Sequence, residues 1–201
     1  MLFTYRNPSG IVFERALSVT LCEYPGCTTT LNVGAPYCAA HLQRVWGLRI
    51  DTSAIADAGL GVFACTRESD DAVVIPEGAV VCTYVGEVIT LRELDKRYGD
   101  TTAPYALDVG MGMAIDAACH RGVGSMINHS SERPNTEFVV DVGDRAVDVV
   151  ATRDIRNGEE ILVNYGADYC FNDAQFATSA TVTSDPFLHR SVAKTKTKTM
   201  V

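Results

Sequence analysis

Long hydrophobic runs are missing from this sequence of 201 residues. No segment approaches the roughly 20 uninterrupted apolar residues that a membrane-spanning helix requires. The N-terminal stretch MLFTYRNPSGIVFERA is interrupted by Arg6, Pro8 and Glu14, so it lacks the apolar centre of a signal peptide. We therefore expect a soluble, intracellular protein without a membrane partner.

Basic residues are also in the minority. The chain has 17 Lys and Arg against 25 Asp and Glu, which gives a formal net charge of −8. This balance argues against direct nucleic-acid binding and favours a basic partner, because complementary charge guides association. The number of cysteines, seven, is odd. Without a secretory signal, an odd count indicates reduced thiols and a reducing compartment.

Three cysteines and one histidine fall within the segment LCEYPGCTTTLNVGAPYCAAHL. Cys22, Cys27, Cys38 and His41 have the spacing C-x4-C-x10-C-x2-H, with turn-forming Pro and Gly residues just before Cys27 and Cys38. Zinc prefers four such ligands in a tetrahedron. We predict a structural zinc site, because the protein would fill all four positions. The alternative is three buried free cysteines and a surface histidine.

From about residue 48 onward, short strands dominate the pattern. Four runs have strand composition, namely AVVCTYVGEV (79–88), TEFVVDV (136–142), RAVDVVA (145–151) and EEILVNY (159–165). Gly143-Asp144 indicates a two-residue hairpin turn between the second and third runs. One helix is predicted from Thr90 to about Tyr98, because Thr90 and Glu93 form a capping box. The sequence therefore predicts a mainly β fold with short helices.

The stretch INHSSERPN (127–135) is unusual at the exit of a buried segment. Pro134 and Asn135 suit a turn. Asn128 and His129 instead bring polar groups to a place where burial is costly unless they are paired. A satisfied core histidine beside an ordinary turn is one interpretation. The other motifs in the chain favour a different one.

Four motifs follow one another in a definite order: AGLGVFA, TYVGEVI, AID with GVGSMINHSSERPN, and RDIRNGEEILVNYG. Each alone has an ordinary explanation as a turn or a packed strand. Together, over roughly residues 48–170, they resemble the SET-domain lysine methyltransferases. The resemblance implies a SET-like fold of several small sheets with a knot-like active site. It divides the chain into an N-terminal zinc-binding module (1–47), a SET-like catalytic domain (48–170) and a C-terminal segment with a basic tail (171–201).

The resemblance also implies roles for individual residues. S-adenosylmethionine would be held by Gly59, Leu60, Gly61, Asn128 and His129. The catalytic residues would be Tyr165 and Tyr84, and the substrate channel would include Tyr105 and Val163. The polar groups of Asn128 and His129 would then form hydrogen bonds with the cofactor and with the strand that crosses this segment, as buried polar groups require.

The chemistry of methyl transfer sets a further requirement. A lysine side chain has a pKa of about 10.4, so making it neutral at pH 7 costs about 4.6 kcal/mol. Desolvation in an aromatic channel and the neighbouring positive sulfonium both lower that pKa. The site therefore needs to align the amine with the methyl group rather than supply a strong base.

Several positions depart from the family pattern. Arg121-Gly122 replaces the usual Gly-Asn, and Ser125 replaces a common Arg. The spacer Ser131-Glu132-Arg133 is one residue longer than usual, and Asn164 stands where Asp is common. Val163 stands where Tyr or Phe often limits the product. These changes leave the methylation state of the product open.

Closure of the channel and the identity of the substrate rest on weaker signals. No cysteine cluster follows Tyr165, so we expect the stretch with Tyr169, Phe171 and Phe176 to close the channel. Residues 101–150 carry seven Asp or Glu against three Lys or Arg. This suits a basic peptide such as a histone tail, and an acidic solvated surface has the same composition. A nuclear location follows only from the histone expectation. The tail KTKTKTM is interpreted as a disordered end, with a self-methylation site or pseudosubstrate as the alternative.

The main prediction is an S-adenosylmethionine-dependent protein-lysine N-methyltransferase, and two other interpretations stay open. A non-catalytic SET-like or PR-like interaction module would bind the cofactor without turnover. A metal enzyme would use His120, His129 and Asp116 as a two-histidine, one-carboxylate site. Mutation of His129 would then release the metal, whereas the zinc interpretation predicts loss on mutation of Cys22 or Cys38.

Overall fold

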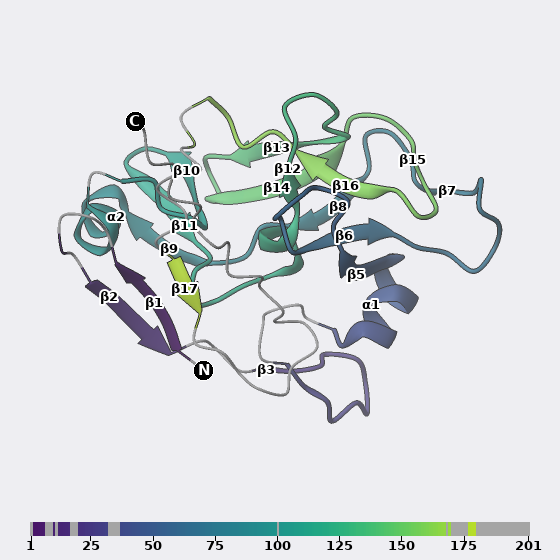
Figure 1. Ribbon diagram of the computed structural model, residues 1–201, viewed down its shortest axis with the longest axis horizontal. Coiled ribbons are helices and arrows are strands. Elements are labelled where there is room, and N and C mark those ends of the chain that lie inside the picture. The colour runs from purple at the N-terminus through teal and green to yellow at the C-terminus, as the bar shows by residue number, and fades with distance from the viewer. Residues whose placement is uncertain are drawn as a thin grey trace, which may run out of the picture.

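The computed structural model describes residues 2–6, 10, 12–16, 20–31, 37–99, 101–167, 169 and 177–179. Within these residues strands predominate (Figure 1). The helices are α1 (Ala39–Trp46) and α2 (Leu91–Tyr98), together with one 3-10 turn, η1 (Val123–Met126). None of the described helices is long and apolar enough to cross a membrane. The predicted mainly β fold is confirmed.

The largest sheet surrounds a strand from the C-terminal part of the chain. Its strands are, in spatial order, β5 (Leu48–Thr52), β6 (Leu60–Ala64), β16 (Glu160–Val163), β13 (Thr136–Asp141), β14 (Ala146–Ala151) and β8 (Val80–Thr83). The short strand β12 (Asn128–His129) also pairs with β16. Strand β16 is antiparallel to β6 but parallel to β12 and β13. Three earlier segments thus enclose one later segment, which is the knot-like arrangement that the sequence predicts.

Apolar side chains from these strands form the main core. Val62, Val149, Ile161 and Val163 are all fully buried there, and Ile127 joins them from the end of η1. Burying an aliphatic side chain of this size stabilises a fold by about 1.5–3 kcal/mol. The polar segment that follows Ile127 is therefore anchored next to β16.

Two of the predicted strand boundaries are wrong in detail. The run 79–88 is divided between β8 and β9 (Glu87–Thr90), because Gly86 packs so closely that an added Cβ would lie 2.8 Å from the backbone of Asp116. The hairpin of β13 and β14 pairs Asp141 with Ala146, so its turn has four residues (142–145) rather than two. Asp141 Oδ1 accepts from the backbone N–H of Asp144 at 3.0 Å and stabilises this wider turn.

Helix α2 begins as the capping box predicts. The hydroxyl of Thr90 accepts from the backbone N–H of Glu93 at 3.1 Å. The helix follows β9, which forms a sheet with β10 (Ala106–Gly110) and β11 (Met113–Asp116) in the order β10-β11-β9. Its buried side chain Tyr98 packs against the aromatic rings of Tyr5 and Phe13.

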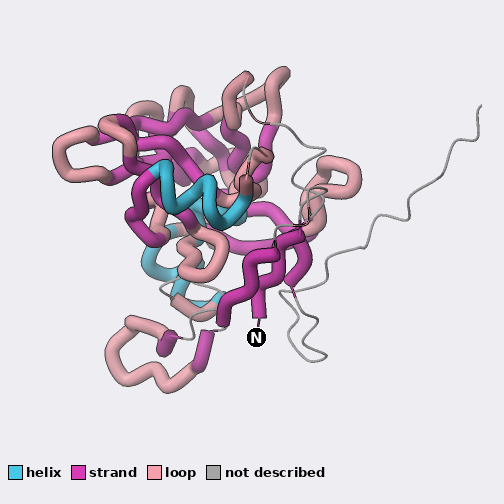
Figure 2. Tube along the Cα trace, turned by 90° about the vertical axis from the view of Figure 1, so that its left-hand side faces the viewer, coloured by secondary structure: helices cyan, strands magenta, loops and turns pink. Residues whose placement is uncertain are grey.

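The first hairpin lies beside α2, as Figures 1 and 2 show. It consists of β1 (Leu2–Arg6) and β2 (Val12–Ala16), and β17 (Ala177–Ser179) pairs with β1 along its other edge. Two small sheets complete the description: β3 (Thr20–Leu21) with β4 (Thr30–Leu31), and β7 (Val73–Ile75) with β15 (Ile155–Arg156).

The domain boundaries drawn from the sequence stay predictions. Helix α1 carries His41, but its Leu42 is buried in the main core. Hairpin β1–β2 lies within the predicted N-terminal module, yet Phe3 and Tyr5 pack with Tyr98 of α2. Phe171, Phe176 and the basic tail, which the sequence analysis singled out, lie outside the described residues.

Candidate functional site

One end of the site is a polar cradle next to β6. The side-chain amide of Asn128 donates to the backbone oxygen of Leu60 and to Oε1 of Glu160, both at 3.0 Å. Gly61 lies against the same groups, and an added Cβ there would be 2.3 Å from Glu160 Oε1 and 3.0 Å from Asn128 Nδ2. A larger residue here would have to displace the side chains of Glu160 and Asn128. Both amide protons of Asn128 are used, so its Oδ1 is presented as an acceptor.

Glu160 is a residue whose role the sequence analysis missed. Its carboxylate accepts from the hydroxyl of Ser53 at 2.6 Å and from the backbone N–H of Ala54 at 3.1 Å. It therefore ties the loop before β6 to β12. The motif GEE was visible in the sequence, but its second carboxylate could be placed only by folding, since Ser53 lies 107 residues away in the chain.

Gly59 ends the same loop, and Leu60 begins β6. Gly59 has φ 77°, a left-handed conformation that favours glycine. Its backbone oxygen accepts from the N–H of Ser53 at 2.8 Å, which closes the loop that Glu160 holds. The structure thus brings together the predicted cofactor residues of β6 and the amide of Asn128.

His129 faces the next part of the site. Its Nδ1 accepts from the backbone N–H of Tyr165 at 3.0 Å. Burial lowers the pKa of this imidazole, and a ring nitrogen that accepts must be unprotonated. The histidine is therefore neutral at pH 7, with its proton on Nε2.

Asn135 is the second residue that the sequence analysis missed, since we assigned it only to a turn. Its side chain is buried, accepts from the N–H of Leu162 at 2.8 Å and donates to the backbone oxygen of Glu160 at 2.9 Å. The hydroxyl of Thr136 adds a bond to the backbone oxygen of Leu162 at 2.9 Å. These bonds fix β16 against the crossing segment.

The other end of the site is a group of tyrosines. The hydroxyl of Tyr165 donates to the backbone oxygen of Ile127 at 2.6 Å, and that of Tyr84 donates to the backbone oxygen of Tyr105 at 3.0 Å. The rings of Tyr165 and Tyr169 are in edge contact, with centroids 4.8 Å apart. Burial raises the pKa of both Tyr84 and Tyr165, so these hydroxyls stay neutral.

Val163 lies beneath this group rather than at a surface. It is fully buried and pairs with His129 and with Thr136 in the main sheet. Its predicted place in the channel and its influence on the product stay predictions. The predicted channel residue Tyr105 is partly buried and packs with the apolar cluster of Tyr84, Val109 and Ile115.

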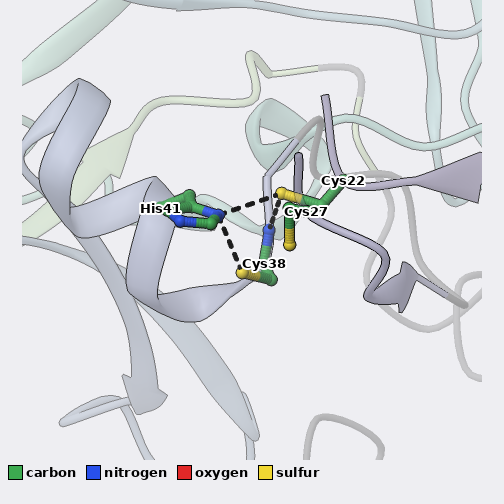
Figure 3. Close-up of side chains that lie close together, drawn as sticks. All are labelled: Cys22, Cys27, Cys38 and His41. Carbon is green, nitrogen blue, oxygen red and sulfur yellow. Dashed lines mark hydrogen bonds between the residues drawn. The ribbon is translucent and has the colours of Figure 1, made fainter. Parts of the chain in front are cut away.

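The candidate zinc ligands lie close together in a separate cluster, with His41 on a helix (Figure 3). One ligand atom of each of Cys22, Cys27, Cys38 and His41 lies within 4.8 Å of all the others. His41 Nδ1 is 3.3 Å from Cys22 Sγ and 3.4 Å from Cys38 Sγ. Sulfur and nitrogen ligands of a tetrahedral zinc ion are about 3.5 Å apart. The four side chains therefore fit zinc in identity and spacing.

Neighbouring groups act on the side chains of this cluster. Hydrogen bonding to Thr29 lowers the pKa of the Cys27 thiol to about 6, whereas burial raises the pKa of the Cys22 thiol. The ring of Tyr24 stacks on His41 with centroids 3.8 Å apart and fixes the orientation of the imidazole. The guanidinium of Arg44 lies over the ring of Tyr24, 5.4 Å from its centroid.

The two-histidine, one-carboxylate interpretation is wrong. Among the described residues, the Cys/His cluster is the only group of three or more side chains placed to hold a metal, and it includes neither Asp116 nor His129. Asp116 is instead bound by Arg97 at 2.8 Å and by the hydroxyl of Tyr98 at 3.0 and 3.1 Å. Its carboxylate supports the junction of β11 and α2.

Fold and site together define a SET-type arrangement, in which a strand is enclosed between a glycine-containing loop and an Asn-His segment. The family model for the SET domain matches residues 59–166, more than half of the chain. The chain belongs to the SET-domain family.

Several known proteins resemble the chain. Histone-lysine N-methyltransferase SUVR5 of Arabidopsis thaliana is 27% identical over 186 residues, which cover 82% of this chain and 12% of the relative. The variant-silencing SET domain-containing protein of Plasmodium falciparum is 33% identical over 127 residues, which cover 57% of this chain and 5% of the relative. Probable inactive histone-lysine N-methyltransferase SUVR1 of A. thaliana is 27% identical over 141 residues, which cover 61% of this chain and 19% of the relative. The chain spans less than a fifth of the length of each of these relatives.

Two solved structures of the Chaetomium thermophilum polycomb repressive complex 2 share the fold. The complex in an autoinhibited conformation bound to S-adenosylmethionine is 28% identical, with a TM-score of 0.50 over 64% of this chain and 16% of that chain. A further structure of the complex is 26% identical, with a TM-score of 0.51 over 67% of this chain and 16% of that chain.

Proposed function

We propose that the chain is an S-adenosylmethionine-dependent protein-lysine N-methyltransferase that acts on a basic peptide, with a histone tail as the preferred substrate class. One observation carries this proposal. The segment Ile127–His129 is bonded to the tyrosine group at one end, through Tyr165, and to the cradle at the other, through Leu60 and Glu160. A methyl donor and a lysine held by the two ends would meet at this segment.

The residues of the cradle fit S-adenosylmethionine. A backbone free of side chains at Gly61 admits close approach of a ligand, and Asn128 Oδ1 offers an acceptor to its N–H groups. The neutral His129 adds no positive charge beside a cationic sulfonium. When bound there, the cofactor would supply an electrophilic methyl group. Gly59, Leu60, Gly61, Asn128 and His129 would hold it, with Glu160 fixing the amide of Asn128.

The tyrosine group suits the lysine side of the reaction. Neutral hydroxyls at Tyr84 and Tyr165 add no negative charge that would favour a lysine ammonium. A lysine in the channel would lose its proton to water and present a neutral nitrogen to the methyl group of the cofactor. The Tyr165 oxygen, whose proton points to Ile127, is oriented to accept from the reacting groups.

The substrate class and the zinc role rest on charge and on the relatives. An acidic chain attracts a basic peptide, and the names of several relatives specify histone lysine. A histone substrate would place the protein in the nucleus. The Cys/His cluster would hold one structural zinc ion, because its four side chains would complete a tetrahedron.

Labelled methyl transfer tests this function. Core histones would be incubated with the protein and methyl-labelled S-adenosylmethionine, beside a Tyr165→Phe variant and lysine-to-arginine substrates. We expect label on lysine and a loss of about 100-fold or more in Tyr165→Phe, because loss of one positioned hydroxyl in an active site has an effect of this size. A matched Tyr37→Phe variant, altered away from the site, should keep its activity. Cofactor binding with no transfer to any basic protein would contradict the proposal.

That last outcome would favour a second candidate, a non-catalytic interaction module. The similarity to a relative named as probably inactive supports this candidate. The departure at Ser125 also supports it, since the hydroxyl of Ser125 donates only to the local backbone oxygen of Gly122 at 2.8 Å.

A further inference from the structure

Arg121, one of the departures from the family pattern, lies against the tyrosine group. Its guanidinium carbon is 4.1 Å from the centroid of the Tyr105 ring and 5.8 Å from that of Phe3. Its Nε donates to the backbone oxygen of Ala118 at 3.1 Å. The Tyr105 backbone oxygen in turn holds the hydroxyl of Tyr84. The positive charge is thus fixed against one wall of the proposed lysine channel.

This charge is not compensated by any described carboxylate. Arg97 pairs with Asp116 and Glu87 at 2.8 Å, and Arg15 pairs with Glu87 at 2.6 Å. Within the described part of the chain no ion pair includes Arg121, and its Nη2 is buried without a hydrogen-bond partner. The two neighbouring cations are therefore neutralised locally, whereas the Arg121 charge is available to act on its surroundings.

The titratable groups that face Arg121 do not neutralise it either. Burial raises the pKa of Tyr84 well above its ordinary value, and it raises that of Cys119 to about 11. Both groups are uncharged at neutral pH. The buried carboxylate of Asp116 is already bound by Arg97 and Tyr98.

Two uses of an unpaired guanidinium can be compared. A direct contact with an acidic ligand would have only the Nη1 group to offer, because Nη2 is buried, Nε is used by Ala118, and the ring of Tyr105 lies against the guanidinium. An effect through the electric field needs no contact, and it is strongest where aromatic walls exclude water. The geometry therefore favours an electrostatic effect on a neighbouring group over a direct contact with a ligand.

We propose that Arg121 is a positioning residue whose fixed charge favours the neutral form of the substrate lysine in the channel. The inference rests on the proposed function and extends it. A like charge disfavours a second cation nearby, so the lysine releases its proton to water more readily when Arg121 is present. The enzyme would then work at a lower pH than the same channel without this charge.

The pH dependence of kcat/KM for methyl transfer tests the proposal. Arg121→Met keeps much of the apolar stem but removes the charge, and Arg121→Lys keeps the charge. We expect the acidic limb of the Arg121→Met profile to move up by about 0.5–1 pH unit, with the high-pH plateau within about threefold of wild type. Arg121→Lys should keep the acidic limb of the wild-type kcat/KM profile. The control Arg67→Met, at an exposed surface position, should keep it as well. Cofactor affinity should be the same in all four proteins.

A second measurement reports on the lysine directly. A substrate peptide with a carbon-13-methylated lysine would be titrated by NMR in complex with S-adenosylhomocysteine and each protein. Its amine should titrate at a higher pH in Arg121→Met than in wild type. Wild type and Arg121→Met could both be active, with the same pH of amine titration and the same acidic limb of the kcat/KM profile. That result would overturn the role of Arg121 but leave the proposed function standing. Absence of methyl transfer by wild type at every pH would overturn both.

Discussion

Around Cys22 the chain folds on itself over short distances, whereas around Asn128 it brings together segments from its whole length. The zinc cluster joins side chains at most 19 residues apart and is flanked by strands of two residues each. The knot joins Asn128 to Leu60 across 68 residues and Ser53 to Glu160 across 107. The first region has little core of its own, while the second contains the main core of the protein.

This contrast shows what each region needs in order to stay folded. Leu21, on the strand beside Cys22, is 61% exposed, so little apolar burial stabilises the cluster. A bound cation would supply most of its free energy of folding. In the knot, fully buried Val62, Ile127 and Ile161 surround the polar groups. Its stability therefore comes from apolar burial and from hydrogen bonds shielded from water.

The largest expected effect follows from removing a zinc ligand. Cys38→Ser should lower zinc affinity by at least about 100-fold, because a tetrahedral site loses one of its thiolates. Metal analysis should find one zinc per wild-type chain and none per variant after dialysis against a weak chelator. Cys65→Ser, at a thiol outside the cluster, should keep its zinc. Equal zinc content in both variants would contradict the assignment of the ligands.

A smaller effect is expected where the knot is opened. Asn135→Ala leaves the buried N–H of Leu162 without its partner and removes a hydrogen bond to the partly buried backbone oxygen of Glu160. The free energy of unfolding should fall by about 3 kcal/mol, since each unsatisfied buried group costs about 1–3 kcal/mol. Urea titration measures this. Asn164→Ala, at an exposed position, should lose less than about 1 kcal/mol. Similar losses in the two variants would show that Asn135 does not hold the strand.

The smallest effect belongs to an ion pair outside both regions. Arg153 binds the partly exposed Glu159 at 2.9 Å, and this hydrogen bonding lowers the pKa of the carboxyl. Arg153→Gln should cost about 0.5 kcal/mol at neutral pH. A carboxyl whose pKa falls on folding stabilises the protein above its unfolded value of about 4.3, and the contribution is lost as the pH falls through the folded value. The difference in free energy of unfolding between wild type and variant should therefore be larger at pH 7 than at pH 3.

The two regions also differ in how far the sequence predicts them. The zinc cluster follows from residue type and spacing, because its members are close in the chain and need only turns between them. The start of α2 is equally local and is confirmed at Thr90 and Glu93. The knot-like fold came from motifs of a known family, and the enclosure of β16 confirms it.

The roles of Asn135 and Glu160 could not be read from the sequence. Both residues also have ordinary local explanations, one in a turn and the other in a charged motif. Their partners, Leu162 and Ser53, become neighbours only when β16 enters the sheet. The same reason explains the division of the run 79–88, which is set by the contact of Gly86 with Asp116.

Calorimetric titration of S-adenosylmethionine into wild type and Gly61→Ala tests the cofactor site most directly. An added methyl at Gly61 would lie 2.3 Å from Glu160 Oε1 and must displace the groups that orient Asn128. We expect one cofactor per wild-type chain and binding at least about tenfold weaker in Gly61→Ala. Gly143→Ala, in the exposed turn of β13 and β14, should bind as wild type does. Equal affinities in all three proteins, or no binding by wild type, would contradict a cofactor site at the knot.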